Sequence, residues 1–305
     1  MISSRMYLYV RSRQLEGSYP GDPTLGTFCQ TNMRVLRGWG VPEESEWPYD
    51  TRIWPPEEPE GMDTAAKKHR ICAYQRVRTL GECKLALARQ CPVQLSMRIV
   101  PEDWRNPPEN RIPMPANESS LTANHAICVV GYDERDHLII QNSWGEKWGD
   151  QGYAYLPQRY FERYHTEAWI IPSDARSLPP LSSEGTFSRA WGFPDCLGEG
   201  LPFVGIELYD GPKDECVGWA FLVKRQGYAD IEEFFIRPSF RGRGFGTALA
   251  ELVKKRPQFE DCPLRLWIGH VDRNNVASAT MQATAKRLGL SINPSRRNWA
   301  SYVGM

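Results

Sequence analysis

A histidine and an asparagine in the middle of the chain are the side chains best suited to nucleophilic chemistry. His125 begins one apolar run, residues 125–132, and Asn142 ends the next, residues 138–142. An asparagine side chain that bonds an imidazole orients the ring, and an oriented histidine beside a thiol generates a nucleophilic thiolate. These two residues therefore predict half of a nucleophilic catalytic site.

The elements that must position this pair are two strands. Both apolar runs are rich in Val and Ile, and the charged turn Asp133–Asp136 joins them, which is typical of a β-hairpin. If the strands pair antiparallel about that turn, His125 and Asn142 lie almost opposite each other. Cross-strand neighbours are about 4.5–5.5 Å apart at Cβ, close enough for the asparagine to orient the imidazole.

The sequences HAICVVGY at 125–132 and NSWGEKWGDQGY at 142–153 resemble the signatures of the papain-like cysteine peptidases almost residue for residue. The resemblance implies that His125 and Asn142 are catalytic and that Trp144 shields the pair. It extends over about residues 1–172 and includes a turn at 22–26, a helix from about Thr27 to Trp39 and the PEESEWPYD loop at 42–50.

The nucleophile that this family requires has no counterpart in a matching motif. The family's cysteine lies in a C-G-[SA]-C-[WY]-like context, and none of the eight cysteines here does. The glutamine that precedes it and helps form the oxyanion hole is also missing. Cys29 lies on an amphipathic helix pattern, where a free cysteine behaves as a small buried hydrophobe. Cys128, three residues beyond His125 on a strand, faces away from the imidazole.

A papain-like fold without its cysteine helix would expose a large apolar surface. We therefore expect an upstream segment or a partner chain to supply that helix, or this half of the domain to have been rebuilt. The implied first domain is an incomplete papain-like half-barrel.

Length and composition limit the remaining possibilities. A chain of 305 residues is long enough for two domains with two cores. Lys plus Arg equals Asp plus Glu at 37 each, which argues against nucleic acid or an anionic membrane as a partner. The first residues are not a signal peptide, no 18-residue apolar run exists, and the cysteines lack metal-ligand spacing. We expect a cytoplasmic protein with reduced thiols and no metal site.

The predicted domain boundary lies in SDARSLPPLSSEG, whose composition is that of a linker. It divides the chain into a first domain at 1–173, a linker at 174–184 and a second domain at 185–305.

The second domain contains consecutive strand-like runs followed by a glycine loop and a helix. The runs are FVGIELYDGP, CVGWAFLVKRQG and ADIEEFFIRP, and the loop and helix are RGRGFGTALAELVKKR. Backbone N–H groups at such a helix start are unsatisfied and lie at the positive end of the helix dipole. Glycines at 242, 244 and 246 would let a pyrophosphate approach them, and Thr247 could add a hydroxyl.

Three interpretations of this loop compete. A dinucleotide-binding loop would need a third glycine at the required spacing and βαβ units, and an ordinary turn would carry no ligand. The third is a family resemblance. IRPSFRGRGFGTALAELV resembles the acetyl-CoA loop of the GNAT acetyltransferases, whose [QR]-x-x-G-x-[GA] pattern falls on Arg241, Gly244 and Gly246. LRLWIGHVDRNNVASATMQATAKRLGL matches the family's next strand and its N-x-x-A helix, from Asn274 to Ala277.

The GNAT resemblance implies an α/β domain with a mixed central sheet and acetyl-CoA, or another acyl-CoA, as cofactor. By that resemblance the amides of 242–247 cradle the pyrophosphate, the strand end near Ile236 pairs with the pantetheine arm, and Asn274 bonds further along the cofactor. The implied cofactor-binding residues are Ile236, Arg241, Gly242, Arg243, Gly244, Phe245, Gly246, Thr247 and Asn274.

In this family a carboxylate on the strand before the loop often deprotonates the acceptor amine. Glu232 and Glu233 are the candidates, and a period of two sends them to opposite faces. We expect one, preferably Glu233, to face the cleft as the base and the other to be a solvated edge charge. The family's thiolate-protonating tyrosine is absent from TMQATAKRLG. Tyr302 could substitute, but its place as a strand aromatic is favoured.

The two helices that cover the acceptor in this family are also hard to place, because GTFSRAWGFPDCLGEGLP is rich in Gly and Pro. Taken together, the sequence predicts an α+β protein with three possible functions. The favoured one is an acyl-CoA-dependent N-acetyltransferase acting on an amine- or peptide-bearing acceptor. The others are a cysteine peptidase or amide transferase that receives its cysteine from elsewhere, and a non-catalytic interaction scaffold.

Overall fold

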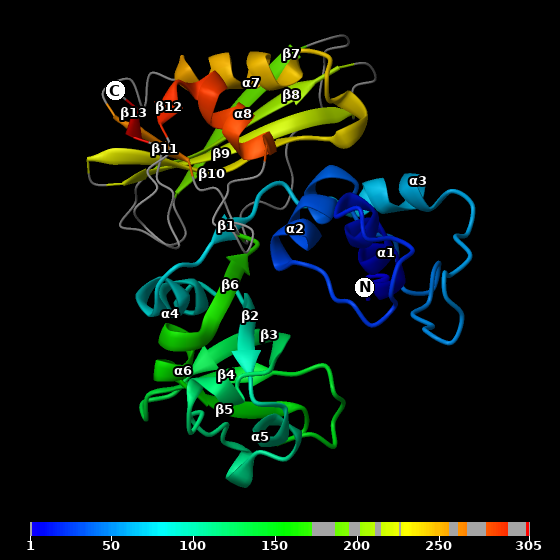
Figure 1. The fold of residues 1–305 in the computed structure, drawn as a ribbon, viewed down its shortest axis with the longest axis vertical. Helices are drawn as coiled ribbons and strands as arrows, with labels where there is room; N and C mark the ends of the chain where they lie inside the picture. The colour runs from blue at the N-terminus through cyan, green and yellow to red at the C-terminus, as the bar shows by residue number, and fades with distance from the viewer. Residues whose placement is uncertain are drawn as a thin grey trace. The chain divides into compact units, whose positions relative to one another are not determined.

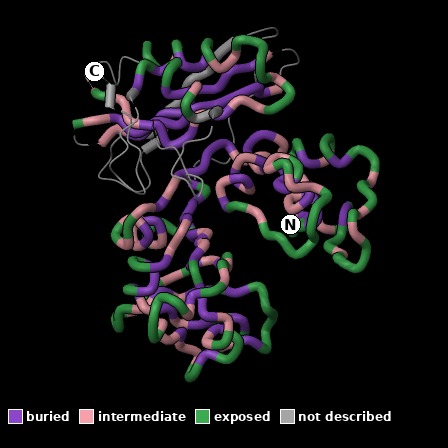
Figure 2. The backbone as a smooth tube through the Cα atoms, viewed as in Figure 1, coloured by how far each residue is buried: buried purple, intermediate pink, exposed green. Residues whose placement is uncertain are grey.

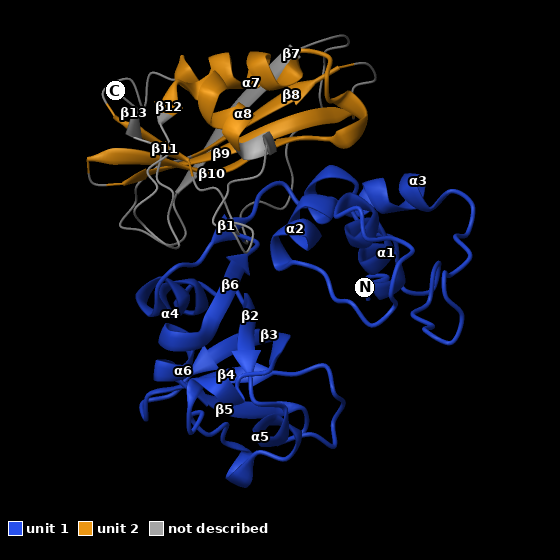
Figure 3. Ribbon diagram, viewed as in Figure 1, with its two compact units in different colours: residues 1–177 blue, residues 178–305 orange. Residues whose placement is uncertain are grey.

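The computed structural model describes residues 2–172, 187–194, 202–210, 215–225, 227–255, 262–266, 279–291 and 303–304. Two compact units divide the chain, residues 1–177 and 178–305 (Figure 3). The predicted linker at 174–184 lies outside the described residues. Within them, no helix combines the length and the apolar character needed to span a bilayer.

The first part of unit 1 is helical. It contains α1 (Arg5–Leu15), α2 (Cys29–Gly38), α3 (Met62–Ala66) and the 3₁₀ segment η1 (Lys67–His69). The Ser4 hydroxyl caps α1 by accepting the backbone N–H of Tyr7 at 3.1 Å. A small apolar core joins α1 to α2, with Tyr7 and Val10 packed against Val35 and Trp47. The helix expected from about Thr27 to Trp39 is α2.

The second part of unit 1 is a six-stranded antiparallel sheet in the order β1-β6-β2-β3-β4-β5 (Figure 1). Buried residues run along its strands (Figure 2), and β2 alternates strictly, with Val93, Leu95, Met97 and Ile99 buried. The strands are β1 (Gln75–Arg76), β2 (Val93–Ile99), β3 (Ala123–Tyr132), β4 (His137–Gln141), β5 (Tyr153–Pro157) and β6 (His165–Ile170). The helical segments around them are α4 (Leu80–Ala88), α5 (Pro101–Arg105), η2 (Pro108–Asn110), η3 (Glu118–Ser120) and α6 (Gln158–Tyr164).

Unit 2 contains a five-stranded mixed sheet in the order β11-β10-β9-β8-β7. Only the β10–β11 pair is parallel among the described strands of this sheet, which confirms the predicted mixed sheet. Its strands are β7 (Phe187–Pro194), β8 (Pro202–Tyr209), β9 (Cys216–Arg225), β10 (Tyr228–Ile236) and β11 (Leu264–Leu266). The other elements are η5 (Pro238–Phe240), α7 (Phe245–Lys254), α8 (Ala279–Leu288), β12 (Leu290–Ser291) and β13 (Val303–Gly304).

The two acceptor-covering helices of the family, which are hard to place in the sequence, have no counterpart among the described residues of the segment 185–202. The described part of that segment is β7, which pairs along its whole length with β8. The described part of this segment is therefore a strand of the sheet.

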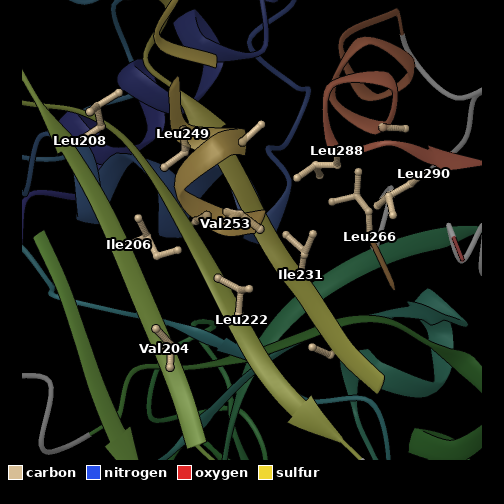
Figure 4. Packing of buried hydrophobic residues seen from close by; sticks show 14 of the residues in the cluster. Val204, Ile206, Leu208, Leu222, Ile231, Leu249, Val253, Leu266, Leu288 and Leu290 are labelled. Carbon is tan, nitrogen blue, oxygen red and sulfur yellow. The ribbon is translucent and has the colours of Figure 1, made fainter. Parts of the chain in front are cut away.

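One face of this sheet is covered by α7 and forms the core of unit 2. Leu249 and Val253 of α7 pack on Ile206, Leu222 and Ile231 of the three central strands (Figure 4). This packing fixes the axis of α7, and with it the place where the preceding glycine loop ends.

Truncation of Leu249 tests this core. The residue is fully buried, and we expect Leu249→Ala to lower the free energy of unfolding of this domain by about 2–5 kcal/mol, through lost transfer energy and a residual cavity. Urea denaturation measures the change. Leu252→Ala, on the same helix but only partly buried, is the matched control and should cost clearly less; equal costs would contradict this packing.

Candidate functional site

The centre of the first candidate site is a hydrogen bond between His125 and Asn142. The Nε2 atom of His125 lies 2.9 Å from Oδ1 of Asn142. The same Oδ1 accepts the backbone N–H of Ser143 at 2.8 Å, which fixes the orientation of the amide with its oxygen toward the imidazole. Nε2 must then carry the hydrogen, because an oxygen can only accept. Nδ1 is left as the basic nitrogen of the neutral ring.

A β-bulge decides that these two side chains meet. Near the turn, Tyr132 of β3 pairs with Leu138 of β4, a register that would place Asn142 opposite Cys128, on the face away from His125. The bulge between Val129 and Gly131 shifts the register by one residue. Asn142 then continues the ladder on the same face as His125, as its diagonal neighbour. The two residues, predicted to lie almost opposite each other, are thus diagonal neighbours, which remain within reach of long side chains.

Aromatic rings enclose the imidazole on two sides. The ring of Trp144 lies 4.7 Å from that of His125, and the buried ring of Trp104 meets it edge-on at 5.6 Å. Trp148 connects the two, since its indole N–H donates to the carbonyl oxygen of Trp104 at 2.6 Å and its ring packs edge-on against Trp144. Trp144 is 43 % exposed and lies against the imidazole ring, and its role as a shield over the His–Asn pair stays a prediction. Trp104 was missed, because it lies outside any motif on α5.

This enclosure sets the protonation state of the histidine. Burial lowers the pKa of His125 below its ordinary value, and the hydrogen bond from Nε2 to Asn142 partly offsets that by stabilising the cation. The ring is therefore neutral at pH 7 and able to accept a proton at Nδ1. Within the described residues, no hydrogen bond to Nδ1 occupies that position.

The cysteines of unit 1 do not complete the site. Cys29 opens α2 and is 3 % exposed. Burial raises the pKa of its thiol well above its ordinary value, and the carboxylate of Glu167 adds to the rise. Burial also raises the pKa of Cys128, which lies on the other face of β3 from His125. Cys29 is thus a buried core residue, as expected from its helix pattern.

The start of α2 shows why Cys29 is not activated by its helix dipole. A cysteine at a helix N-terminus commonly has a lowered pKa. Here carboxylates take up the first amides of the helix: Glu16 accepts the backbone N–H of Phe28 and Glu167 that of Gln30, each at 2.9 Å. Beyond the effect of burial, the negative charge of Glu167 opposes ionisation of the Cys29 thiol.

The second candidate site is the loop before α7. Gly242 and Gly244 have φ values of 78° and 85°, a left-handed backbone that side-chain-bearing residues rarely adopt. Gly244 caps α7 without any side-chain hydrogen bond, and its carbonyl accepts the N–H groups of Thr247 and Ala248. Across the described residues, no acceptor is recorded for the backbone N–H groups of residues 242–246. The loop therefore presents consecutive unsatisfied donors at the positive end of a helix.

The flanking residues are placed as follows. The Arg241 side chain donates from Nε to the Ile236 carbonyl at 3.0 Å and lies over the ring of Phe235, so it ties the loop to the end of β10. Thr247 is exposed in the first turn of α7. The expected cofactor contact Asn274 and the alternative acid Tyr302 lie outside the described residues.

The expectation for Glu232 and Glu233 was wrong in one respect. Both are buried, at 2 % and 3 % exposure, so neither is a solvated edge charge. The register of β10 against β9 shifts between Ile231 and Glu233, and this bulge breaks the alternation on which the expectation rested. Nη2 of Arg225 lies 3.4 Å from Oε1 of Glu232, so that carboxylate already has a cationic partner.

Glu233 remains the candidate base, and the strand register places other residues on the same face of the sheet. Glu233 and Phe235 of β10, Trp219 of β9 and Glu207 of β8 all lie on the face of the sheet opposite α7. Glu207 is fully buried and accepts the hydroxyl of Tyr209 at 2.8 Å. In the sequence, the only sign of a role for Glu207 is that it is an acidic residue within an apolar strand. Among the described residues, no cluster of His, Cys, Asp and Glu could hold a metal ion.

The tautomer of His125 can be tested by titration. We expect its pKa to lie below about 6.5, with the hydrogen on Nε2. Asn142→Ala should lower the pKa further, because the bond that stabilises the imidazolium is lost. Long-range ¹H–¹⁵N NMR reports both properties. His165, which is also buried and has a lowered pKa, is the internal control and should not change; a raised pKa for His125 in the variant would contradict this geometry.

Two family models match successive parts of the chain. The papain family cysteine protease model matches residues 25–168, and the acetyltransferase (GNAT) family model matches residues 174–289. An uncharacterised peptidase C1-like protein of Acanthamoeba polyphaga mimivirus is 30 % identical over 183 residues, which are 55 % of this chain and 58 % of that protein. Mus musculus cathepsin K is 58 % identical over 36 residues, 11 % of each chain.

Among solved structures, xylellain, a cysteine protease from Xylella fastidiosa, matches with a TM-score of 0.50 and 29 % identity. The match covers 55 % of this chain and 69 % of xylellain. Of the mimivirus relative, by contrast, the chain spans a little over half of the length. It combines a papain-family cysteine peptidase domain with a GNAT-family acetyltransferase domain that follows it.

Proposed function

We propose that the GNAT domain binds an acyl-CoA, preferably acetyl-CoA, and transfers the acyl group to the amine of an acceptor. The observation that carries this proposal is the loop before α7, with its left-handed glycines and its unsatisfied amides at 242–246. A pyrophosphate is the group that such a loop suits, because it accepts several N–H donors at once and its charge is stabilised by the helix dipole.

The glycines fit the group in a second way. A Cβ built at Gly242 or Gly244 would meet no protein atom within 4 Å, so no side chain or backbone of the protein fills the space beside these two glycines. Glycine is nevertheless required there because of the positive φ values. The loop backbone is therefore both held in a left-handed conformation at these glycines and accessible from outside.

The bound acyl-CoA would supply a thioester, whose carbonyl carbon an acceptor amine attacks while the thiolate of CoA leaves. The chain's own contribution is to hold the cofactor and to take the proton that the amine loses. Glu233 is the proposed base, directly or through a water, since the carboxylate of Glu232 lies against Arg225. A peptide-like acceptor would suit both domains, because peptidases and N-acyltransferases both act on amides and amines.

Acyl-CoA binding is tested by calorimetry with acetyl-CoA. We expect saturable binding to the wild-type chain and at least a roughly tenfold weaker affinity for Gly244→Val, because a side chain there strains the loop and covers the amides. Gly227→Val is the matched control: Gly227 also has a positive φ, at 83°, and open space around it, but it lies in the β9–β10 turn. No heat with the wild-type chain, or equal affinities for Gly244→Val and wild type, would refute the proposal.

A second candidate function is favoured by the peptidase domain. The neutral imidazole of His125 has its Nε2 engaged by Asn142, and its Nδ1 is free, among the described residues, to accept a proton from a thiol. We propose that a cysteine from an upstream segment or a partner chain completes this site as a cysteine peptidase or amide transferase. The non-catalytic scaffold is the remaining possibility if neither chemistry is found.

A peptidyl epoxide that alkylates papain-type thiolates tests the second candidate. Because burial raises the pKa of Cys29 and of Cys128, we expect the chain alone to take up no adduct, as measured by intact mass. An adduct should form when a longer form or a partner brings a cysteine to His125, and His125→Ala should abolish it. Rapid alkylation of Cys29 in the chain alone would contradict this assignment.

A further inference from the structure

An arginine from a different helix lies against the first turn of α7. A Cβ built at Gly246 would be 3.7 Å from both Cζ and Nε of Arg287 and 3.8 Å from its Nη1. Gly246 is the second residue of α7, and Arg287 lies in the last turn of α8. The packing of α8 on α7, through Leu288 in the shared core (Figure 4), thus brings a guanidinium beside the amides of the loop.

This placement puts a positive charge beside the positive end of a helix. The N-terminal end of a helix carries about half a positive charge, and the guanidinium carries a whole one. Within the described part of the chain, no carboxylate forms an ion pair with Arg287. Arg243, whose guanidinium lies 5.5 Å from the ring of Phe240 and 5.9 Å from that of Phe245, adds a further positive charge next to Gly244. Such a concentration of positive charge is relieved by a bound anion.

The dipole of its own helix, α8, gives only a partial reason for a cation at position 287. A cation in the last turn of α8 is stabilised by the negative end of that helix, but Lys286, its neighbour, fulfils the same role. The dipole of α8 does not account for the guanidinium that lies over Gly246. Arg241 has a different role from Arg287, since it donates a hydrogen bond to the Ile236 carbonyl and stabilises the loop itself.

We propose that Arg287 is a cofactor-binding residue that contacts the pyrophosphate of the acyl-CoA together with the loop amides. A planar guanidinium can give two parallel hydrogen bonds to phosphate oxygens. It would thereby close the side of the pyrophosphate that faces α8, while the amides of residues 242–246 hold the side that faces α7. This inference rests on the proposed acyl-CoA function and adds to it a side chain outside the loop motif.

The test compares three ligands by calorimetry: CoA, 3′-dephospho-CoA, which keeps the pyrophosphate, and pantetheine, which lacks it. We expect Arg287→Gln to raise the Kd of CoA and of 3′-dephospho-CoA by about tenfold each, the effect of losing charge-assisted hydrogen bonds at an accessible site. Pantetheine should bind equally to both proteins. Arg287→Lys should fall between, since it keeps the charge but not the planar fork.

Lys286→Gln is the matched control, because it removes the same charge from the same turn, and it should leave all three affinities within about twofold of wild type, as expected for screened surface charge. Equal CoA affinity in Arg287→Gln and wild type would overturn the inference, and so would a loss for CoA without a loss for 3′-dephospho-CoA. A wild-type chain that binds neither CoA nor 3′-dephospho-CoA would instead refute the proposed function itself. Thermal unfolding of each variant shows that the fold is retained.

Discussion

One extra residue in a strand determines the side-chain arrangement of both candidate sites. The bulge at Val130 in β3 turns Asn142 onto the face that carries His125, and the bulge at Glu232 in β10 turns Glu233 onto the face of the sheet opposite α7. A bulge shifts every side chain on one side of it relative to the partner strand. In each domain the register change therefore lies within a few residues of the proposed chemistry, and deleting one residue there would separate the groups without removing any of them.

The two sites otherwise rely on different physical effects. In the peptidase domain the essential feature is directional: one amide oxygen, fixed by a backbone N–H, selects which imidazole nitrogen bears the hydrogen. In the acetyltransferase domain it is a concentration of positive potential, to which backbone amides, the dipole of α7 and nearby guanidinium groups contribute. The first favours proton transfer between precisely placed partners. The second favours capture of a charged ligand, and it is more sensitive to ionic strength.

The sequence predicts the local elements of this chain well, because they depend on short-range patterns. The hairpin that carries His125 and Asn142 follows from its two apolar runs and charged turn, and the loop before α7 follows from glycines spaced for a left-handed backbone. Features that depend on long-range packing could not be predicted in this way. The bulges that set the faces of Asn142 and Glu232 are register differences between strands, and alternation alone gives no sign of them.

The same limit applies to residues that reach a site from a distant element. Trp104 touches His125 only because the short helix α5 packs against the sheet, and Arg287 reaches Gly246 only because α8 packs on α7. Glu207 enters the face of Glu233 through strand order rather than through any motif. Each is an ordinary residue in the sequence, and its role arises from tertiary contacts that no local pattern encodes.

The burial of the cysteines has a consequence for the redox behaviour of the protein. Burial raises the pKa of Cys83 to about 12, and the pKa values of Cys29 and Cys128 are raised as well. Peroxide oxidation and thiol–disulfide exchange both proceed through the thiolate, so these sulfurs are poor substrates for oxidants and for glutathione. A sulfur brought to the neutral imidazole of His125 would lose its proton far more readily than these three. Three cysteines of the peptidase domain thus resist ionisation, while the neutral imidazole of His125 is the proposed base for a sulfur from elsewhere.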